Sequence, residues 1–225
     1  MLKPDGELES STVVANNTMN RDRGLTGVNS YHRALGLDPY DVLRARLRER
    51  GRASWLDLCC GEANALIEAA GRLGTDGLGS AVTIVGVDLV GRLRPGPICP
   101  GLSLVTASIA TWDPQPEQRF DLVTCVHGLH YIGDKLGLLT RAMRWLTPDG
   151  VLIADFDRHP DASPATRRVV RTLRQAGADY DPRTHRVTCR GPLDPSFPAH
   201  YLGADDAAGP SYTGQPGVAS HYRWL

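Results

Sequence analysis

Residues 55–70 read WLDLCCGEANALIEAA, and the parts of this stretch together predict how the chain folds. The apolar run from Trp55 to Leu58 has the composition of a buried strand, and Gly61 then supplies the residue that a tight turn favours. From Ala63 onward, apolar residues recur at helical spacing. A helix that begins directly behind a strand points its N-terminal amide groups at the strand's carboxyl end. The stretch therefore predicts a nucleotide-binding turn.

Apolar runs and amphipathic stretches alternate along the rest of the chain. Asp38 and Pro39 form an N-cap and first-turn pair, which predicts a helix that continues to Gly51. The other expected elements are strands at 54–59, 82–88, 102–108, 120–126 and 150–156 and helices at 63–73, 134–146 and 164–176. Strands and helices in this order predict a doubly wound α/β fold.

A chain of 225 residues is long enough to form one domain with its own core. Residues 1–24 are polar and lack apolar periodicity, so we expect a mobile segment there. Residues 25–225 are expected to form a single α/β domain. It would have a helical cap at 25–51, a ligand-binding core at 52–157, and a C-terminal helix with two further strands at 158–225.

Composition limits the class of partner. Lys and Arg total 25 and Asp and Glu total 25, so no net charge draws the chain to nucleic acid or to an acidic membrane. There is no signal-peptide pattern and no apolar run of about 18 residues, so we expect a soluble, cytoplasmic protein. The five cysteines form neither a CxxC pair nor a metal-ligand cluster, so we expect reduced thiols and no metal site.

The turn after Trp55 resembles motif I of the class I S-adenosylmethionine (SAM) methyltransferases. In that motif an acidic residue and three alternating glycines let the backbone pass close to the cofactor. Asp57 and Gly61 match the pattern, whereas Cys59 and Ala63 stand at glycine positions. The resemblance implies that these four residues belong to the cofactor site, with Asp57 in reach of the charged amino acid end of SAM.

The resemblance covers residues 53–157 and implies a mostly parallel sheet of seven strands that ends in an antiparallel hairpin. Residues 183–189 and 219–225 are the candidate strands for this hairpin. Residues 145–150, WLTPDG, end a helix and begin the next strand in the manner of the LKPGG turn of many small-molecule methyltransferases.

The resemblance also assigns the nucleoside end of SAM. The apolar run from Val82 ends in Asp88, where the family places an acid on the ribose hydroxyls; a plain strand cap is the alternative. Ser108 stands where the family often has an aspartate at the adenine amino group, and the backbone of Ile109 is the alternative contact. Leu89 and Ile109 would enclose the adenine ring or, alternatively, pack in the core.

Residues 120–131, FDLVTCVHGLHY, resemble the fourth motif of the family, whose strand brings its last residues to the sulfonium and methyl group. Val126 ends this expected strand, and His127, His130 and Tyr131 follow it, where ligands bind in open α/β sheets. Histidine is well suited to accept a proton from a hydroxyl near neutral pH. We therefore expect His127 to act as a general base or to orient the acceptor. For His127 and for His130, the alternative is a packing role.

Other side chains are candidates for contacts with the acceptor or the cofactor. Tyr31 belongs to a segment that closes over the cofactor in related enzymes, so its ring either faces the sulfonium or anchors the following helix. Asp155, Asp157 and His159 follow the expected fifth strand and either touch the acceptor or cap the helix at 164–176. Three tyrosines of the Gly-rich tail are candidates for closing a pocket over a small acceptor: Tyr201, Tyr212 and Tyr222.

These residues favour a SAM-dependent methyltransferase that acts on a small-molecule acceptor in bacterial secondary metabolism. Displacement at a sulfonium needs alignment, a dry site and, for a hydroxyl acceptor, a base, and it needs no metal. An NAD-dependent dehydrogenase is disfavoured because CCGEAN lacks the G-x-G-x-x-G fingerprint. Methylation of nucleic acid is disfavoured because there is no basic tract and no NPPY or DPPY motif after the fourth expected strand.

Two alternatives use the same cofactor. A cyclase or lyase of this fold would act on SAM alone and form a small ring amino acid and methylthioadenosine. Cys59 and Ala63 stand where the family has glycines, and this difference would reshape the methionine end of the site. The difference favours the cyclase or lyase. The other alternative is a non-catalytic SAM-binding module, against which the acid pair Asp57 and Asp88 argues. The acceptor and the oligomeric state stay open.

Overall fold

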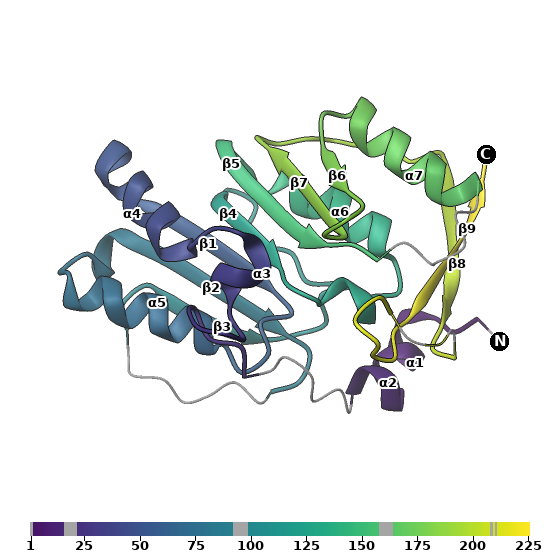
Figure 1. Ribbon diagram of the computed structural model, residues 1–225, viewed down its shortest axis with the longest axis horizontal. Helices are drawn as coiled ribbons and strands as arrows, with labels where there is room; N and C mark the ends of the chain where they lie inside the picture. Colours follow the sequence, from purple (N-terminus) through teal and green to yellow (C-terminus); the bar gives the residue numbers. More distant parts are fainter. Residues whose placement is uncertain (1, 16–21, 92–98, 158–163, 208, 210) are drawn as a thin grey trace.

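The computed structural model describes residues 2–15, 22–91, 99–157, 164–207, 209 and 211–225. At its centre is a seven-stranded sheet in the order β3-β2-β1-β4-β5-β7-β6 (Figure 1). Strands β1 to β5 run parallel, and β7 lies antiparallel to both β5 and β6. The strands are β1 (Ala53–Leu58), β2 (Val82–Asp88), β3 (Leu102–Thr106), β4 (Phe120–Cys125), β5 (Leu146–Asp155), β6 (Asp179–Asp181) and β7 (Arg186–Arg190). The predicted fold class is confirmed.

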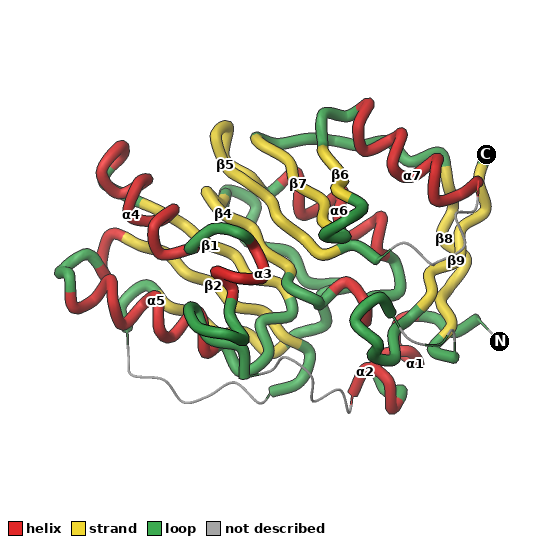
Figure 2. Tube along the Cα trace, viewed as in Figure 1, coloured by secondary structure: helices red, strands yellow, loops and turns green. Residues whose placement is uncertain are grey.

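Helices cover both faces of this sheet (Figure 2). They are α3 (Tyr31–Leu35), α4 (Pro39–Arg50), α5 (Asn64–Thr75), α6 (Lys135–Arg144) and α7 (Pro164–Gln175), with short 3₁₀ helices η1 (Gly79–Ala81) and η2 (Leu129–Tyr131). Because side chains alternate along a strand, Trp55 packs in the core on the α4–α5 side and Leu56 packs in the core on the α6–α7 side. Strand β4 is buried along its whole length, as is typical of a central parallel strand.

The predicted helix start at Asp38 is confirmed in α4. The Asp38 carboxylate accepts a hydrogen bond from the backbone N–H of Tyr40 at 2.9 Å, and Pro39 occupies the first turn. The helix ends at Gly51, which has a φ of 71° that favours glycine. Local capping therefore determines both ends of this helix.

The predicted partners of the antiparallel hairpin were wrong. Strand β7 pairs with β6 rather than with residues 219–225. Those residues form β9 (Ala219–Trp224), which pairs with β8 (Ala199–Asp205) in a separate two-stranded sheet. A tight turn joins β6 to β7, so their pairing closes only a short loop. Strand β6 has just three residues and no apolar run that would predict it.

Residues 2–15 belong to the segment that we expected to be mobile, and the structure gives them regular secondary structure. They form α1 (Asp5–Glu9) and α2 (Thr12–Ala15), and Lys3 makes a β-bridge with Ala204 of β8. Leu8 is 1 % exposed and packs in a small core with Val14, Ala204 and Val218. Helices this short cannot show apolar periodicity, and their packing partners lie at the other end of the chain. Figure 1 shows α1 and α2 beside β8 and β9.

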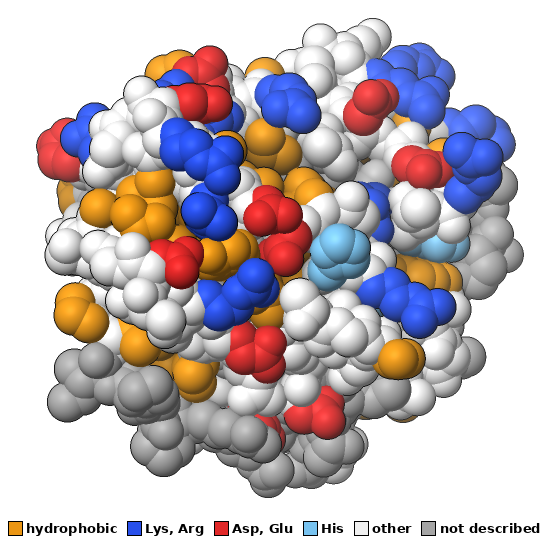
Figure 3. Space-filling view, turned by 60° about the vertical axis from the view of Figure 1, so that its left-hand side comes forward, with side chains coloured by type: hydrophobic (Ala, Val, Ile, Leu, Met, Phe, Trp, Pro, Cys, Tyr) orange, Lys and Arg blue, Asp and Glu red, His pale blue; other side chains and the backbone are white. Residues whose placement is uncertain are grey.

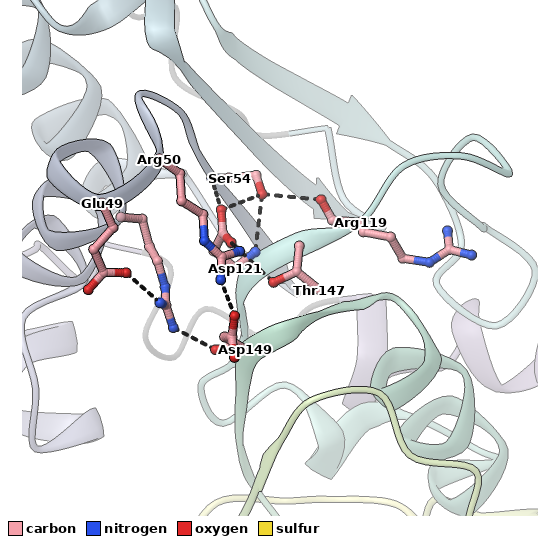
Figure 4. A network of polar contacts seen from close by, with 8 residues as sticks. Glu49, Arg50, Ser54, Arg119, Asp121, Thr147 and Asp149 are labelled. Atoms are coloured by element: carbon pink, nitrogen blue, oxygen red, sulfur yellow. Dashed lines mark hydrogen bonds and ion pairs between the residues drawn. The ribbon is translucent and has the colours of Figure 1, made fainter.

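A polar network joins β1, β4 and β5 at their amino ends (Figure 4). The buried Asp121 carboxylate accepts hydrogen bonds from the backbone N–H of Ser54 at 2.9 Å and from the Thr147 hydroxyl at 3.1 Å. Arg50 forms ion pairs with Asp121 and with Asp149. These contacts fill the amino edge of the sheet, so a ligand site is expected at the opposite, carboxyl edge.

Acidic and basic side chains are mixed over the face of the molecule in Figure 3. This distribution agrees with the equal totals of acidic and basic residues in the sequence. Within the described part of the chain, no helix is both long enough and apolar enough to cross a membrane.

Candidate active site

A cavity lies at the carboxyl ends of β1, β2 and β4. Nine of the predicted site residues line it: Tyr31, Cys59, Gly61, Asp88, Leu89, Ile109, Val126, His127 and Tyr131. The other four predicted residues lie outside the lining: Asp57, Ala63, Ser108 and His130.

The turn after β1 has a left-handed backbone at three alternating residues. The φ angles are 59° at Cys59, 61° at Gly61 and 63° at Ala63. This conformation costs a residue with a Cβ about 1–2 kcal/mol. Cys59 and Ala63 therefore keep the backbone conformation that glycine favours, and each carries a side chain at a glycine position of the family motif. Gly128 lies against this turn, and a Cβ at Gly128 would be only 2.4 Å from the Cβ of Cys59.

Asp88 at the end of β2 connects that strand to the turn. Its Oδ2 accepts a hydrogen bond from the backbone N–H of Gly61, and its Oδ1 accepts one from the backbone N–H of Val90, both at 2.9 Å. Because Asp88 lines the cavity, its place agrees with the predicted ribose contact.

Asp57 is buried behind Tyr31. The Tyr31 hydroxyl donates to Asp57 Oδ2 at 2.6 Å, and the Thr124 hydroxyl donates to Oδ1. Thr124 in turn accepts a hydrogen bond from Trp55 Nε1 at 2.8 Å. Burial raises the pKa of Asp57 to about 7, against the lowering effect of its two hydrogen bonds. Tyr31 therefore anchors its helix, as one of the two expectations held, and it also lines the cavity.

Replacing Tyr31 with phenylalanine is expected to lower the free energy of unfolding by about 1–2 kcal/mol above pH 7 and by less at acidic pH. Above its pKa of about 7, Asp57 is ionised and loses a charge-assisted donor in the variant. Below that pKa it is protonated and depends less on the donor. Urea unfolding at about pH 5 and pH 8 checks this trend.

The control for this pH trend is Tyr40→Phe. The Tyr40 hydroxyl donates to the exposed Asp76, so this variant loses a tyrosine hydrogen bond that does not involve a buried acid. An equal loss of stability at both pH values in Tyr31→Phe would show that Asp57 does not titrate as described.

His127 follows β4 with a left-handed backbone, φ 57°. Its backbone N–H donates to Asp155 Oδ2 at 3.0 Å, its Nδ1 is 3.6 Å from the same oxygen, and the Tyr212 hydroxyl lies 3.4 Å from Nδ1. Burial, together with the charges of Arg23 and Arg186, lowers the pKa of His127 to about 4, and burial raises the pKa of Asp155 to about 6. Near neutral pH the ring is uncharged and able to accept a proton, and an ionised carboxylate lies beside it.

His130 lies behind His127, with 5.9 Å between the ring centroids. It is 2 % exposed, and neither ring nitrogen has a hydrogen-bond partner among the described residues. Burial lowers its pKa to about 3, so the ring is neutral. Asp157 accepts a hydrogen bond from the backbone N–H of Tyr212 at 2.9 Å. His159 lies outside the described residues.

The side of the cavity near β3 holds the predicted adenine residues. Leu89 and Ile109 line the cavity and also pack in the apolar clusters, so the two expected roles are compatible. The Ser108 hydroxyl donates to the carboxylate of Glu9 in α1, which lines the cavity as well. A carboxylate thus lies beside Ser108, although it comes from the N-terminal segment.

A family model described as a methyltransferase domain matches residues 31–187. The chain belongs to the class I SAM-dependent methyltransferases. SAM is accordingly its cofactor. No curated protein has a sequence that matches this methyltransferase.

Several solved structures are similar to this methyltransferase in fold. The plantazolicin methyltransferase BpumL, in complex with SAH, is 12 % identical with a TM-score of 0.46, over 67 % of this chain and 55 % of its own. The amino pentose methyltransferase CalS10 of Micromonospora echinaspora, with SAM bound, is 23 % identical with a TM-score of 0.39, over 59 % of this chain and 53 % of its own. The methyltransferase thus spans about half the length of these proteins.

The residues of the cavity fit SAM. The turn after β1 contributes Cys59 and Gly61 to the cavity wall. Asp88 presents a carboxylate to ligand hydroxyls, and Leu89 with Ile109 gives an apolar surface for a base. These groups would hold the amino acid end, the ribose and the adenine of the cofactor in that order.

Residues far from the motifs complete the cavity wall of the methyltransferase. They include Asp5, Leu8, Glu9, Val14 and Arg23. The prediction of a mobile N-terminal segment excluded them. A signal in the sequence was the presence of Leu8, Val13 and Val14 in a mostly polar segment.

Proposed function

We propose that this methyltransferase transfers the methyl group of SAM to a small-molecule acceptor in bacterial secondary metabolism, in the cytoplasm and without nucleic acid or a membrane as partner. The observation that carries the proposal is His127 on the cavity wall, with Nδ1 3.6 Å from the Asp155 carboxylate. The zero net charge and the five free cysteines support the choice of partner and compartment.

When bound, SAM supplies a methyl group on a positively charged sulfur. His127, uncharged near neutral pH, accepts the acceptor's proton at Nδ1, and Asp155 stabilises the resulting imidazolium. The apolar walls at Leu89, Ile109 and Val126 exclude water, which strengthens these charge interactions. Among the described residues, no three His, Cys, Asp or Glu side chains are grouped to hold a metal ion.

The test is incubation with SAM, first alone and then with a panel of phenols, amines and acids, followed by mass spectrometry. We expect S-adenosylhomocysteine and a methylated product only when an acceptor is present. Methylthioadenosine from SAM alone, well above the rate without enzyme, would instead identify a SAM cyclase or lyase. Failure to bind SAM or S-adenosylhomocysteine would contradict both activities.

A further inference from the structure

The ring of Tyr212 lies against three histidines at the edge of the active site. It is stacked on His185, with 4.1 Å between the centroids and 4° between the planes. It meets His130 edge to face at 5.2 Å and lies 6.2 Å from His127. His127 and His130 follow the same strand, whereas His185 lies more than 50 residues further along the chain, so the fold assembles an aromatic box around one planar ring.

The Tyr212 hydroxyl occupies the position that the hydroxyl of a methyl acceptor would need in order to give its proton to His127. It is 3.4 Å from His127 Nδ1, the atom that accepts a proton in the proposed function. Burial and the carboxylates of Asp155 and Asp157 raise the pKa of Tyr212, and the guanidinium groups of Arg186 and Arg23 oppose this effect only in part. A hydroxyl at this position therefore keeps its proton until a base accepts it.

The backbone at this box is strained. His127 and His185 both have left-handed conformations, with φ of 57° and 52°. Each costs about 1–2 kcal/mol, and such strain gathers at ligand sites. The two rings lie close to the Tyr212 ring, so the strained positions shape the place that this ring occupies.

Tyr212 lies in an exposed turn. The residue is 38 % exposed, and its segment is closed by backbone hydrogen bonds from Ser211 to Gln215 and from Gly214 to Ser211. Gly214 has a φ of 80° and open space around it. Inside the box, His130 keeps two buried nitrogens with no hydrogen-bond partner among the described residues. A ligand that replaced the Tyr212 ring would take over its ring contacts with the three histidines and its hydroxyl contact with His127.

We propose that the acceptor is a phenol whose ring replaces that of Tyr212 on His185 and whose hydroxyl takes the place at His127 Nδ1. This inference rests on methyl transfer as the proposed function. The acceptor oxygen gives its proton to Nδ1 and bonds to the methyl carbon as the carbon–sulfur bond breaks. The electron pair of that bond stays on sulfur, which leaves S-adenosylhomocysteine and a methyl aryl ether.

A phenol fits this box better than an aliphatic alcohol for two reasons. The parallel stacking at 4.1 Å requires a planar ring. A phenol, with a pKa of about 10, also releases its proton far more readily than an aliphatic alcohol. A weakly basic histidine such as His127 therefore suits a phenol.

The test uses p-cresol, which is the tyrosine side chain as a free molecule, and the variant Tyr212→Gly. We expect p-cresol to bind the variant about 10-fold more tightly than the unaltered protein by calorimetry, because the protein's own ring no longer competes. Tyr212→Phe keeps a competing ring and should bind p-cresol like the unaltered protein. Adding His185→Ala to Tyr212→Gly should abolish the gain.

The matched ligand is 4-methylcyclohexanol, which has the same substituents on a ring that is not planar. It should gain nothing from Tyr212→Gly. Equal p-cresol affinity in the variant and the unaltered protein, or an equal gain for 4-methylcyclohexanol, would overturn the inference.

These binding measurements need no SAM, so they are separate from the test of methyl transfer. With SAM added, Tyr212→Gly should convert p-cresol to 4-methylanisole. Binding of p-cresol without methylation would support the aromatic site and contradict the proposed function. Methylation of other acceptors by a protein that does not bind p-cresol would overturn this inference alone.

Discussion

Replacing His127 with alanine is expected to lower kcat by about 10²- to 10⁴-fold, the usual contribution of general acid–base catalysis. The acceptor's proton then has no site at His127 Nδ1, the atom beside the Asp155 carboxylate. The Kd for SAM should stay the same. Single-turnover rates with an acceptor found in the screen, together with calorimetric titration of SAM, check both parts.

His200 on β8 provides the matched control, because it is exposed and lies outside the cavity lining. His200→Ala should leave kcat unchanged. Weaker SAM binding with unchanged kcat in His127→Ala would reduce His127 to a packing role.

In the unaltered protein kcat should fall as the pH drops below about 6, because Asp155 becomes protonated and no longer stabilises the imidazolium.

Replacing Asp88 with alanine is expected to weaken SAM binding by about 1.5–3 kcal/mol, or roughly 10- to 100-fold, if two charge-assisted hydrogen bonds to the ribose are lost. The variant also loses the bonds that connect Asp88 to Gly61 and Val90, so the turn after β1 is less well ordered. Calorimetric titration with SAM and with S-adenosylhomocysteine measures the effect.

Asp88→Asn separates the two contributions to that loss. It keeps the shape and one acceptor oxygen but loses the charge, so its SAM affinity should be intermediate. Melting curves without ligand show whether either variant has lost the fold. Unchanged SAM affinity in a folded Asp88→Ala protein would refute the ribose contact.

The parallel part of the sheet was predictable because burial on both faces gives continuous apolar runs. Strand β4 follows such a run, and α4 begins at a capping residue that is visible in the sequence. Strand β6 was not predictable, because its three residues pair through the short turn that follows them. The partner of β9 was predicted wrongly because pairing of β9 with β8 depends on contacts across the Gly-rich tail.

The site was predictable where its residues follow strands directly. Asp88, Val126 and His127 line the cavity because parallel strands end at one edge of the sheet. Asp57 lies behind Tyr31 because a hydrogen bond between distant residues positions it, and no local pattern reports such a bond. The same holds for Glu9, whose carboxylate accepts a hydrogen bond from the hydroxyl of Ser108, 99 positions away in the sequence.

The packing of α1 on β8 also affects when the site forms during synthesis. The Tyr201 hydroxyl donates to Asp5 at 2.9 Å, and these residues are 196 positions apart. A chain still on the ribosome lacks this support until β8 has emerged from the exit tunnel. The wall that Leu8 and Glu9 provide is then absent, even though every strand of the central sheet has already been translated. A nascent chain is therefore expected to bind SAM only after β8 has emerged.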